Sequence, residues 1–189
     1  MKYLITLLAL IPVISMAVFF IDGLGIVWFD QLVVWVENIF GFTLPSVENK
    51  LYYLCKVSGV SALWILIIAF WVNPLHTYAR FDLREFKKLI GGFAIFYGIL
   101  HLVLFIAAHQ FAVGHLGKLF FSHLFLSVGV GALLILSIAP QVKSWYKFLY
   151  IGIVLVIIHL LLGYRPLETP HIAAISLLSL GLALRLIKR

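Results

Sequence analysis

The stretch KLIGGFAIFYGILHLVLFIAAHQ, residues 88–110, begins with a lysine and then runs on without another Lys, Arg, Asp or Glu. At a rise of about 1.5 Å per residue, such a run is long enough to cross the hydrocarbon core of a bilayer, which is about 30 Å thick. The sequence therefore predicts a transmembrane helix over about 88–110. This helix carries His101 in its interior, where a histidine is energetically costly, so His101 is the first candidate functional residue.

The rest of the chain contains five similar apolar runs, at about 3–21, 51–73, 119–139, 148–164 and 171–187. Prolines at positions 74, 140, 166 and 170 punctuate these runs. We interpret the first run as a retained helix rather than a signal peptide, because it is long enough to span a bilayer. Between the first two spans, from Gly23 to Lys50, an apolar surface is interrupted by Asp30 and Glu37, which is typical of an amphipathic segment lying in the membrane interface. The predicted fold is an all-α integral membrane protein, a six-transmembrane-helix bundle that forms one domain over residues 1–189.

The composition supports a membrane protein over a soluble enzyme. Of the 189 residues, 64% are hydrophobic and 11% are charged, whereas soluble domains have about 25% charged residues. The single cysteine, Cys55, excludes an internal disulfide and a cysteine-based zinc or iron–sulfur site. We attribute the excess of 14 basic over 7 acidic residues to membrane topology and expect no nucleic-acid partner.

Basic residues are enriched on the cytoplasmic side of membrane proteins, so their distribution predicts the orientation. If the N-terminus lies in the cytoplasm, ten basic residues fall inside and four fall outside. The inner set is Lys2, Arg80, Arg84, Lys87, Lys88, Lys143, Lys147, Arg185, Lys188 and Arg189, and the outer set is Lys50, Lys56, Lys118 and Arg165. The sequence thus predicts a multi-pass protein with both termini in the cytoplasm.

Two of the seven histidines lie deep in predicted spans. His101 lies 13 residues after Lys88 and His159 lies 12 residues after Lys147, which correspond to rises of about 20 Å and about 18 Å. Because both helices are predicted to run outward, the two imidazoles can face each other at one depth. Two facing imidazoles are what the axial positions of one haem iron require, so we assign His101 and His159 as candidate haem-iron ligands.

Small residues share the helix faces of these histidines and would leave room for a flat porphyrin. They are Gly91, Ala94 and Gly98 before His101, and Gly152 and Gly163 around His159. Small residues also line ordinary helix contacts in membranes, with histidines hydrogen-bonding between helices. A small histidine-dependent transporter and an assembly protein without a cofactor are further alternatives. The transporter is disfavoured because no Asp or Glu lies deep in a predicted span.

The remaining histidines and the inner basic residues lie near the membrane surfaces. His76 is predicted at the inner surface, and His109, His115, His123 and His171 near the outer surface. Interfacial histidines are usually solvated, although this group could dock a redox partner. The inner residues Arg84, Lys87 and Lys88, with Arg80, serve first as topological anchors and alternatively as a site for a flavin or lipid phosphate.

The segment from Lys87 to His101, KKLIGGFAIFYGILH, resembles the third helix of the MsrQ (YedZ) family, within the ferric-reductase-like transmembrane superfamily. In that family a basic pair, a glycine, a Phe/Tyr-rich turn and a haem-ligating histidine follow in this order. Ser58-Gly59 with Ala62-Leu63, ending at Asn73-Pro74-Leu75, resembles the second helix of the family. Tyr150, nine residues before His159, resembles the fifth, so the resemblance covers about residues 51–187.

The resemblance implies an electron-transfer subunit of the bacterial inner membrane that binds b haem through His101 and His159. Its electrons would come from a cytoplasmic flavin reductase, through FMN, or from membrane quinol. They would pass to a periplasmic molybdopterin-dependent enzyme that reduces methionine sulfoxide, with ferric iron as the alternative acceptor. Some family members carry another histidine 13 positions before the later ligand, where this chain has Tyr146. This departure predicts one haem per chain.

Overall fold

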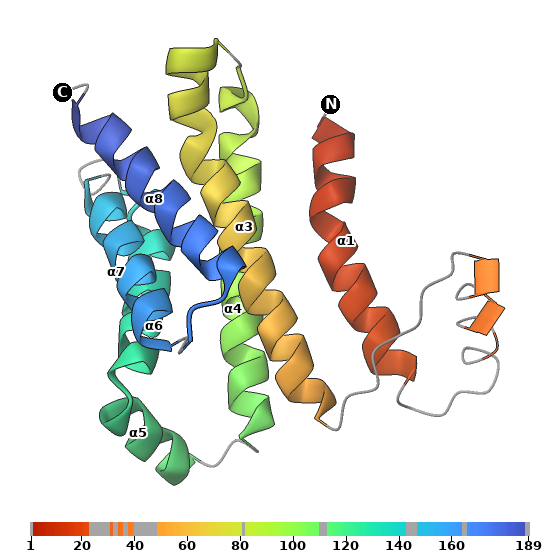
Figure 1. Cartoon of the computed structure of the whole chain (residues 1–189). Coiled ribbons are helices and arrows are strands. Elements are labelled where there is room, and N and C mark those ends of the chain that lie inside the picture. The colour runs from red at the N-terminus through yellow and green to blue at the C-terminus, as the bar shows by residue number, and fades with distance from the viewer. Residues whose placement is uncertain are drawn as a thin grey trace.

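The structure is a computed structural model of the chain. The structure describes residues 2–22, 31, 34–35, 38–39, 49–80, 82–109, 113–142, 147–163 and 166–187. Within these ranges the chain is a bundle of helices with short connections (Figure 1). The helices are α1 (Lys2–Ile21), α3 (Lys50–Ala79), α4 (Lys87–Ala108), α5 (Val113–Ser122), α6 (Leu124–Ile138), α7 (Phe148–Gly163) and α8 (Thr169–Ile187), with a 3₁₀ turn, η2, at Arg84–Phe86.

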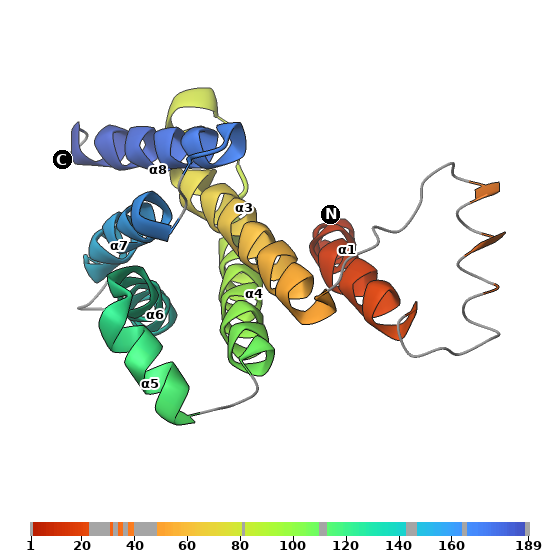
Figure 2. The same ribbon diagram turned by 60° about the horizontal axis from the view of Figure 1, so that its bottom comes forward.

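Two helix pairs form the body of the bundle. Helices α3 and α4 pack along each other, as do α6 and α7, and α8 contacts both α3 and α7. Figure 2 shows the two pairs side by side, with α8 lying across one side of them and α1 beyond α3. The pairs meet only weakly between α4 and α6. The two pairs are therefore joined mainly through α8.

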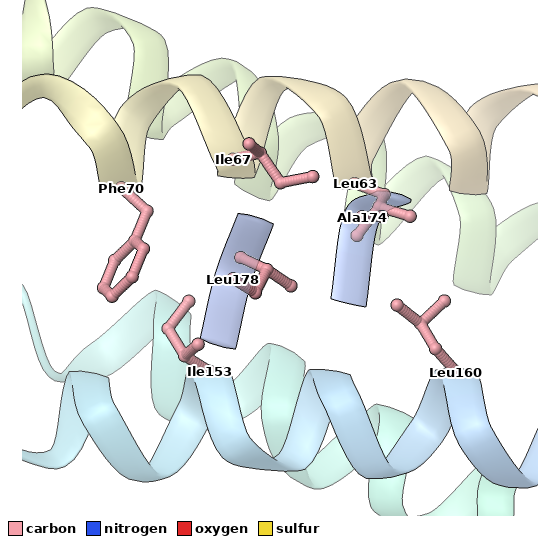
Figure 3. Close-up of a cluster of buried hydrophobic side chains, with 7 residues drawn as sticks. All are labelled: Leu63, Ile67, Phe70, Ile153, Leu160, Ala174 and Leu178. Atoms are coloured by element: carbon pink, nitrogen blue, oxygen red, sulfur yellow. The ribbon is translucent and has the colours of Figure 1, made fainter. Parts of the chain in front are cut away.

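The core lies where α8 joins α3 to α7. Its buried members are Leu63, Ile67 and Phe70 of α3, Ile153 and Leu160 of α7, and Ala174 and Leu178 of α8 (Figure 3). Ala174 and Leu178 are one turn apart on α8 and have no exposed surface, so α8 presents one narrow stripe to the other two helices. Helix α8 therefore connects the two helix pairs through this core.

Helix α1 is held by the side chain of Tyr97 from α4. The buried Tyr97 hydroxyl donates to the carbonyl oxygen of Ala9 at 2.6 Å and accepts from the N–H of Val13 at 3.0 Å. In a regular α-helix that N–H would donate to that carbonyl. The hydroxyl thus lies within the hydrogen-bond ladder of α1, next to Pro12, and ties α1 to α4.

Helix α3 continues past the end predicted for it at residue 73. Pro74 lies inside the helix, which ends at Arg80 in a left-handed conformation (φ 55°). Because proline has no N–H, it leaves the carbonyl of Phe70, four residues earlier, without its helical donor. The Arg185 guanidinium of α8 donates a hydrogen bond to this carbonyl. A contact between distant segments therefore satisfies the carbonyl that Pro74 leaves open.

The range predicted as one span at 119–139 contains a break. His123 has an extended backbone (φ −115°, ψ 91°), so α5 ends at Ser122 and α6 begins at Leu124. Local hydrogen bonds stabilise the corner: Ser127 Oγ donates to the Phe120 carbonyl at 2.7 Å, and the Leu126 N–H donates to the His123 carbonyl at 3.0 Å. Neither a glycine nor a proline marks this corner in the sequence.

Four helices are long and apolar enough to cross a membrane: α1, α3, α4 together with η2, and α8. Helices α6 and α7 are apolar but have only 15 and 16 residues. The interfacial segment predicted between the first two spans lies, apart from residues 31, 34–35 and 38–39, outside the described residues. The described part of the chain thus confirms the prediction of an all-helical protein with apolar helices.

Candidate functional site: two histidines on one cavity

A cavity of about 860 Å³ lies between the pair α3–α4 and the pair α6–α7. Its volume falls within the range of sites for small molecules and cofactors, about 300–1,000 Å³. Both predicted ligands, His101 of α4 and His159 of α7, line it. Helices α4 and α7 also start at the same end of the bundle (Figure 1). The structure therefore brings the two histidines together on one cavity.

His101 is held by the facing helix α3. Its Nδ1–H donates to the carbonyl oxygen of Cys55 at 2.8 Å, and the Cys55 thiol lies 3.5 Å from the same nitrogen. One turn further along α3, Gly59 makes room for the ring: a Cβ atom at residue 59 would lie 2.8 Å from His101 Nδ1 and 2.9 Å from Cε1. Only a residue without a side chain fits beside the imidazole in this position.

His159 is held in the same way by helix α6. Its Nδ1–H donates to the carbonyl oxygen of Phe125 at 2.7 Å. One turn further along, a Cβ atom at Gly129 would lie 2.7 Å from both Cε1 and Nδ1 of His159. Each histidine therefore meets a backbone carbonyl and a glycine four residues after that carbonyl on the neighbouring helix.

The repeated arrangement determines the tautomer of both rings. A carbonyl oxygen can only accept a hydrogen bond, so Nδ1 carries the proton in each neutral imidazole, and Nε2 keeps its lone pair. Metal-ligating histidines in proteins usually donate their other ring N–H to a carbonyl or carboxylate in this manner. Two imidazoles with unprotonated Nε2 atoms thus line the cavity, and these side chains would suit a haem iron as ligands.

The small residues predicted around the histidines fall into two groups. Gly91, Ala94 and Gly98 line the cavity, and a Cβ atom at Gly98 would also lie 2.8 Å from Leu133 Cδ1 of α6. Gly152 and Gly163 instead face α6: their Cβ atoms would lie 2.8 Å from Leu136 and 3.4 Å from Phe125, respectively. The glycines of α7 therefore allow close packing of α6 and α7.

Gly59 and Gly129 were not singled out as site residues from the sequence. Gly59 belongs to the stretch that resembles the second helix of a known family, but its partner is 42 positions away in the chain. Neither glycine shares a helix with the histidine that it contacts. A local motif search cannot find such pairs, because they depend on the register between helices.

Among the other histidines, His171 at the start of α8 is buried and also lines the cavity. His109 donates from Nδ1 to the Phe105 carbonyl of its own helix at 2.9 Å and stacks on that phenyl ring at 4.4 Å. His123 is exposed at the break between α5 and α6. The side chain of His115 and all of Tyr146 lie outside the described residues, so the prediction made on Tyr146 stays a prediction.

The structure divides the predicted cluster Arg84, Lys87 and Lys88. The two lysines line the cavity, at the end where α3 joins α4. Arg84 instead binds Asp82 with both arms of its guanidinium, Nε to Oδ1 at 3.0 Å and Nη2 to Oδ2 at 2.8 Å. These hydrogen bonds, with a third from the Arg84 N–H, hold the pKa of Asp82 well below its usual range.

Arg185 of α8 lines the cavity beside the two lysines. Its guanidinium lies over the Phe70 ring, with Cζ 4.0 Å from the ring centroid. The region formed by Arg80, Arg84, Lys87, Lys88 and Arg185 is called the basic end of the bundle below. One cavity therefore has a basic end and a histidine end, about 20 Å apart along α4.

No protein-family model matches the chain, and comparisons with curated proteins and with solved structures give no significant match either.

Proposed function

We propose that this chain is a b-haem-binding membrane subunit that relays electrons across the bacterial inner membrane. The donor is a flavin or a quinol on the cytoplasmic side. The acceptor is a periplasmic molybdopterin-dependent enzyme that reduces methionine sulfoxide, as the resemblance to the MsrQ (YedZ) family implies. The sulfoxide chemistry belongs to that partner, and this chain serves as the electron-transfer subunit.

The main support for the proposal is that His101 and His159 form the same kind of hydrogen bond. Each Nδ1–H is bonded to a backbone carbonyl, so both Nε2 atoms keep a lone pair with which His101 and His159 would hold a haem iron. When bound, haem supplies one-electron redox chemistry at its iron. The carbonyls of Cys55 and Phe125 orient the rings and increase their basicity, and the mainly apolar cavity wall excludes water from the ligands.

A six-span topology with both termini in the cytoplasm completes the proposal. Helix α1 begins, α8 ends and α3 joins α4 at one end of the bundle (Figure 1), and this is the basic end. Basic residues favour the cytoplasmic side. In this topology α6 and α7 cross the bilayer with α1, α3, α4 and α8, and the histidine end of the cavity faces the periplasmic half.

The test is the spectrum and the haem content of the purified full-length chain. We expect a low-spin b-type signal in the dithionite-reduced minus oxidised spectrum, with about one haem per polypeptide by pyridine haemochrome. His101→Ala and His159→Ala should each abolish this low-spin signal, because each removes one of the two axial ligands.

His76→Ala and His109→Ala are the matched controls, since both remove a histidine outside the paired site. They should retain the wild-type spectrum and haem content. A chain that purifies folded from haem-sufficient cells without any haem would refute the proposal. Retention of the low-spin signal in His101→Ala or His159→Ala would remove that residue from the ligand set.

A further inference from the structure

The cavity carries positive charge at its basic end. Lys87, Lys88 and Arg185 line it, and no Asp or Glu is among the described residues that line the cavity. Lys87 and Arg185 lie close enough for their charges to repel each other. Bringing like charges together in an apolar wall is unfavourable unless an anion lies between them.

Arg185 is anchored with its guanidinium at the cavity. It donates to the Phe70 carbonyl that Pro74 leaves without a donor, it stacks on the Phe70 ring, and it interacts with the Tyr150 hydroxyl. Its Nε is buried and has no hydrogen-bond partner among the residues that the structure describes. None of these contacts neutralises the charge, so the guanidinium is held in place and keeps a donor for an anion.

Arg84 provides the contrast at the same end of the bundle. It forms a bidentate ion pair with Asp82, and His76 Nε2 lies 3.9 Å from the same carboxylate. The charge of Arg84 is therefore compensated within the chain, outside the cavity. Of the five basic residues at this end, Arg84 is neutralised by Asp82, whereas Lys87, Lys88 and Arg185 line the cavity and have no carboxylate among its described lining residues.

The cavity wall between the basic end and the histidines is apolar. Its lining there includes Ala69, Gly91, Gly92, Ile95, Leu136 and Leu149. Two neutral polar side chains in this part are already bonded to carbonyls of α6: Ser137 Oγ donates to the Leu133 carbonyl at 2.7 Å, and Gln141 Nε2, from the turn after α6, donates to the Ser137 carbonyl at 2.9 Å. An acyl chain fits this wall better than a flavin ring, whose polar edge would lose its hydrogen bonds to water.

We propose that the basic end binds the phosphate of an anionic phospholipid. The phosphate is held by Lys87, Lys88 and Arg185. One acyl chain fills the apolar part of the cavity between the basic end and the histidines. Pockets of basic residues between membrane helices bind lipid headgroups in this way, and guanidinium and ammonium groups are the usual phosphate donors. The lipid closes the basic end of the cavity whether or not a haem is present at the other end.

The test is lipid retention by the full-length chain in native mass spectrometry, with phosphatidylglycerol and phosphatidylcholine of identical acyl chains as probes. The wild type should prefer phosphatidylglycerol by tenfold or more. Lys87→Gln with Lys88→Gln should weaken phosphatidylglycerol binding by about 30-fold, since each basic residue near a membrane surface contributes a factor of about five. Arg80→Gln with Arg84→Gln removes the same charge at the same end and should leave binding unchanged.

The outcomes distinguish the lipid site from a flavin site, and they test it separately from the haem proposal. Equal retention of the two lipids, or an equal loss in the Arg80/Arg84 control, would overturn the lipid site. Competition by FMN for bound phosphatidylglycerol, with both lost in the Lys87/Lys88 variant, would assign the site to a flavin phosphate instead. Haem content measured on the same samples should not change in either variant, so the two proposals fail independently.

Discussion

Gly59 of α3 lies directly against the imidazole of His101, because a Cβ atom at residue 59 would be 2.8 Å from His101 Nδ1. Gly129 of α6 has the same relationship to His159. The two glycines and the carbonyls four residues before them place both imidazoles on the cavity. The two glycines are 70 positions apart in the chain. The two helix pairs therefore present their histidines by one local geometry.

Gly59→Ala and Gly129→Ala should each lower haem content severalfold, because the added methyl group must displace the ring and its hydrogen bond to the carbonyl. The control is Gly92→Ala, where an added Cβ atom meets nothing within 4 Å. The control should keep its haem and gain up to about 1 kcal/mol of helix stability. Haem per polypeptide is the measurement. A wild-type haem content in both Gly59→Ala and Gly129→Ala would show that the placement of the imidazole rings does not depend on the glycines.

Tyr97→Phe should loosen α1 from α4, because the variant loses the hydroxyl that lies between Ala9 and Val13 of α1. We expect a loss of about 1 kcal/mol in unfolding free energy, the usual size for hydrogen bonds between membrane helices. Tyr52→Phe is a suitable control, since Tyr52 is 63% exposed. Equilibrium unfolding in mixed micelles measures the stability of both variants. Equal stability of the two variants would argue that the hydrogen bonds of Tyr97 do not hold α1 against α4.

Arg185→Leu should destabilise the chain by about 1–3 kcal/mol, because it leaves the Phe70 carbonyl without a donor. Pro74→Ala returns a backbone N–H to that carbonyl, so the same Arg185 substitution should cost less in the Pro74→Ala background. A double-mutant cycle by equilibrium unfolding measures this coupling. If the Arg185 substitution costs the same in both backgrounds, the guanidinium stabilises the chain by another contact.

Reporters fused to the N-terminus and to the C-terminus should show the same side of the membrane, and that side should be the cytoplasm. The reason is that α1 begins and α8 ends at the basic end (Figure 1), where positive charge is retained during insertion. Alkaline phosphatase and green fluorescent protein fusions measure the two sides. Opposite locations for the two termini would mean an odd number of spans.

The positions of the helices could largely be predicted from the sequence, but their interruptions could not. Helix α3 continues through Pro74 because Arg185, more than 100 positions later, satisfies the carbonyl that the proline leaves open. His123 interrupts the span predicted at 119–139 through an extended backbone that no glycine or proline announces. Local rules on proline and glycine describe the isolated helix, whereas both of these features depend on contacts with distant residues.

The sequence by itself determined the apolar helices and the positions of His101 and His159 along them, because length, hydropathy and a rise of about 1.5 Å per residue are properties of each helix alone. Only the tertiary structure decided that Gly59 and Gly129 face these histidines, that Gly152 faces α6, and that Arg185 replaces Arg84 at the cavity. The physical reason is that lipid-facing and core-facing side chains are equally apolar in a membrane helix. Hydropathy then carries little information on which face meets which neighbour, and packing between helices decides it.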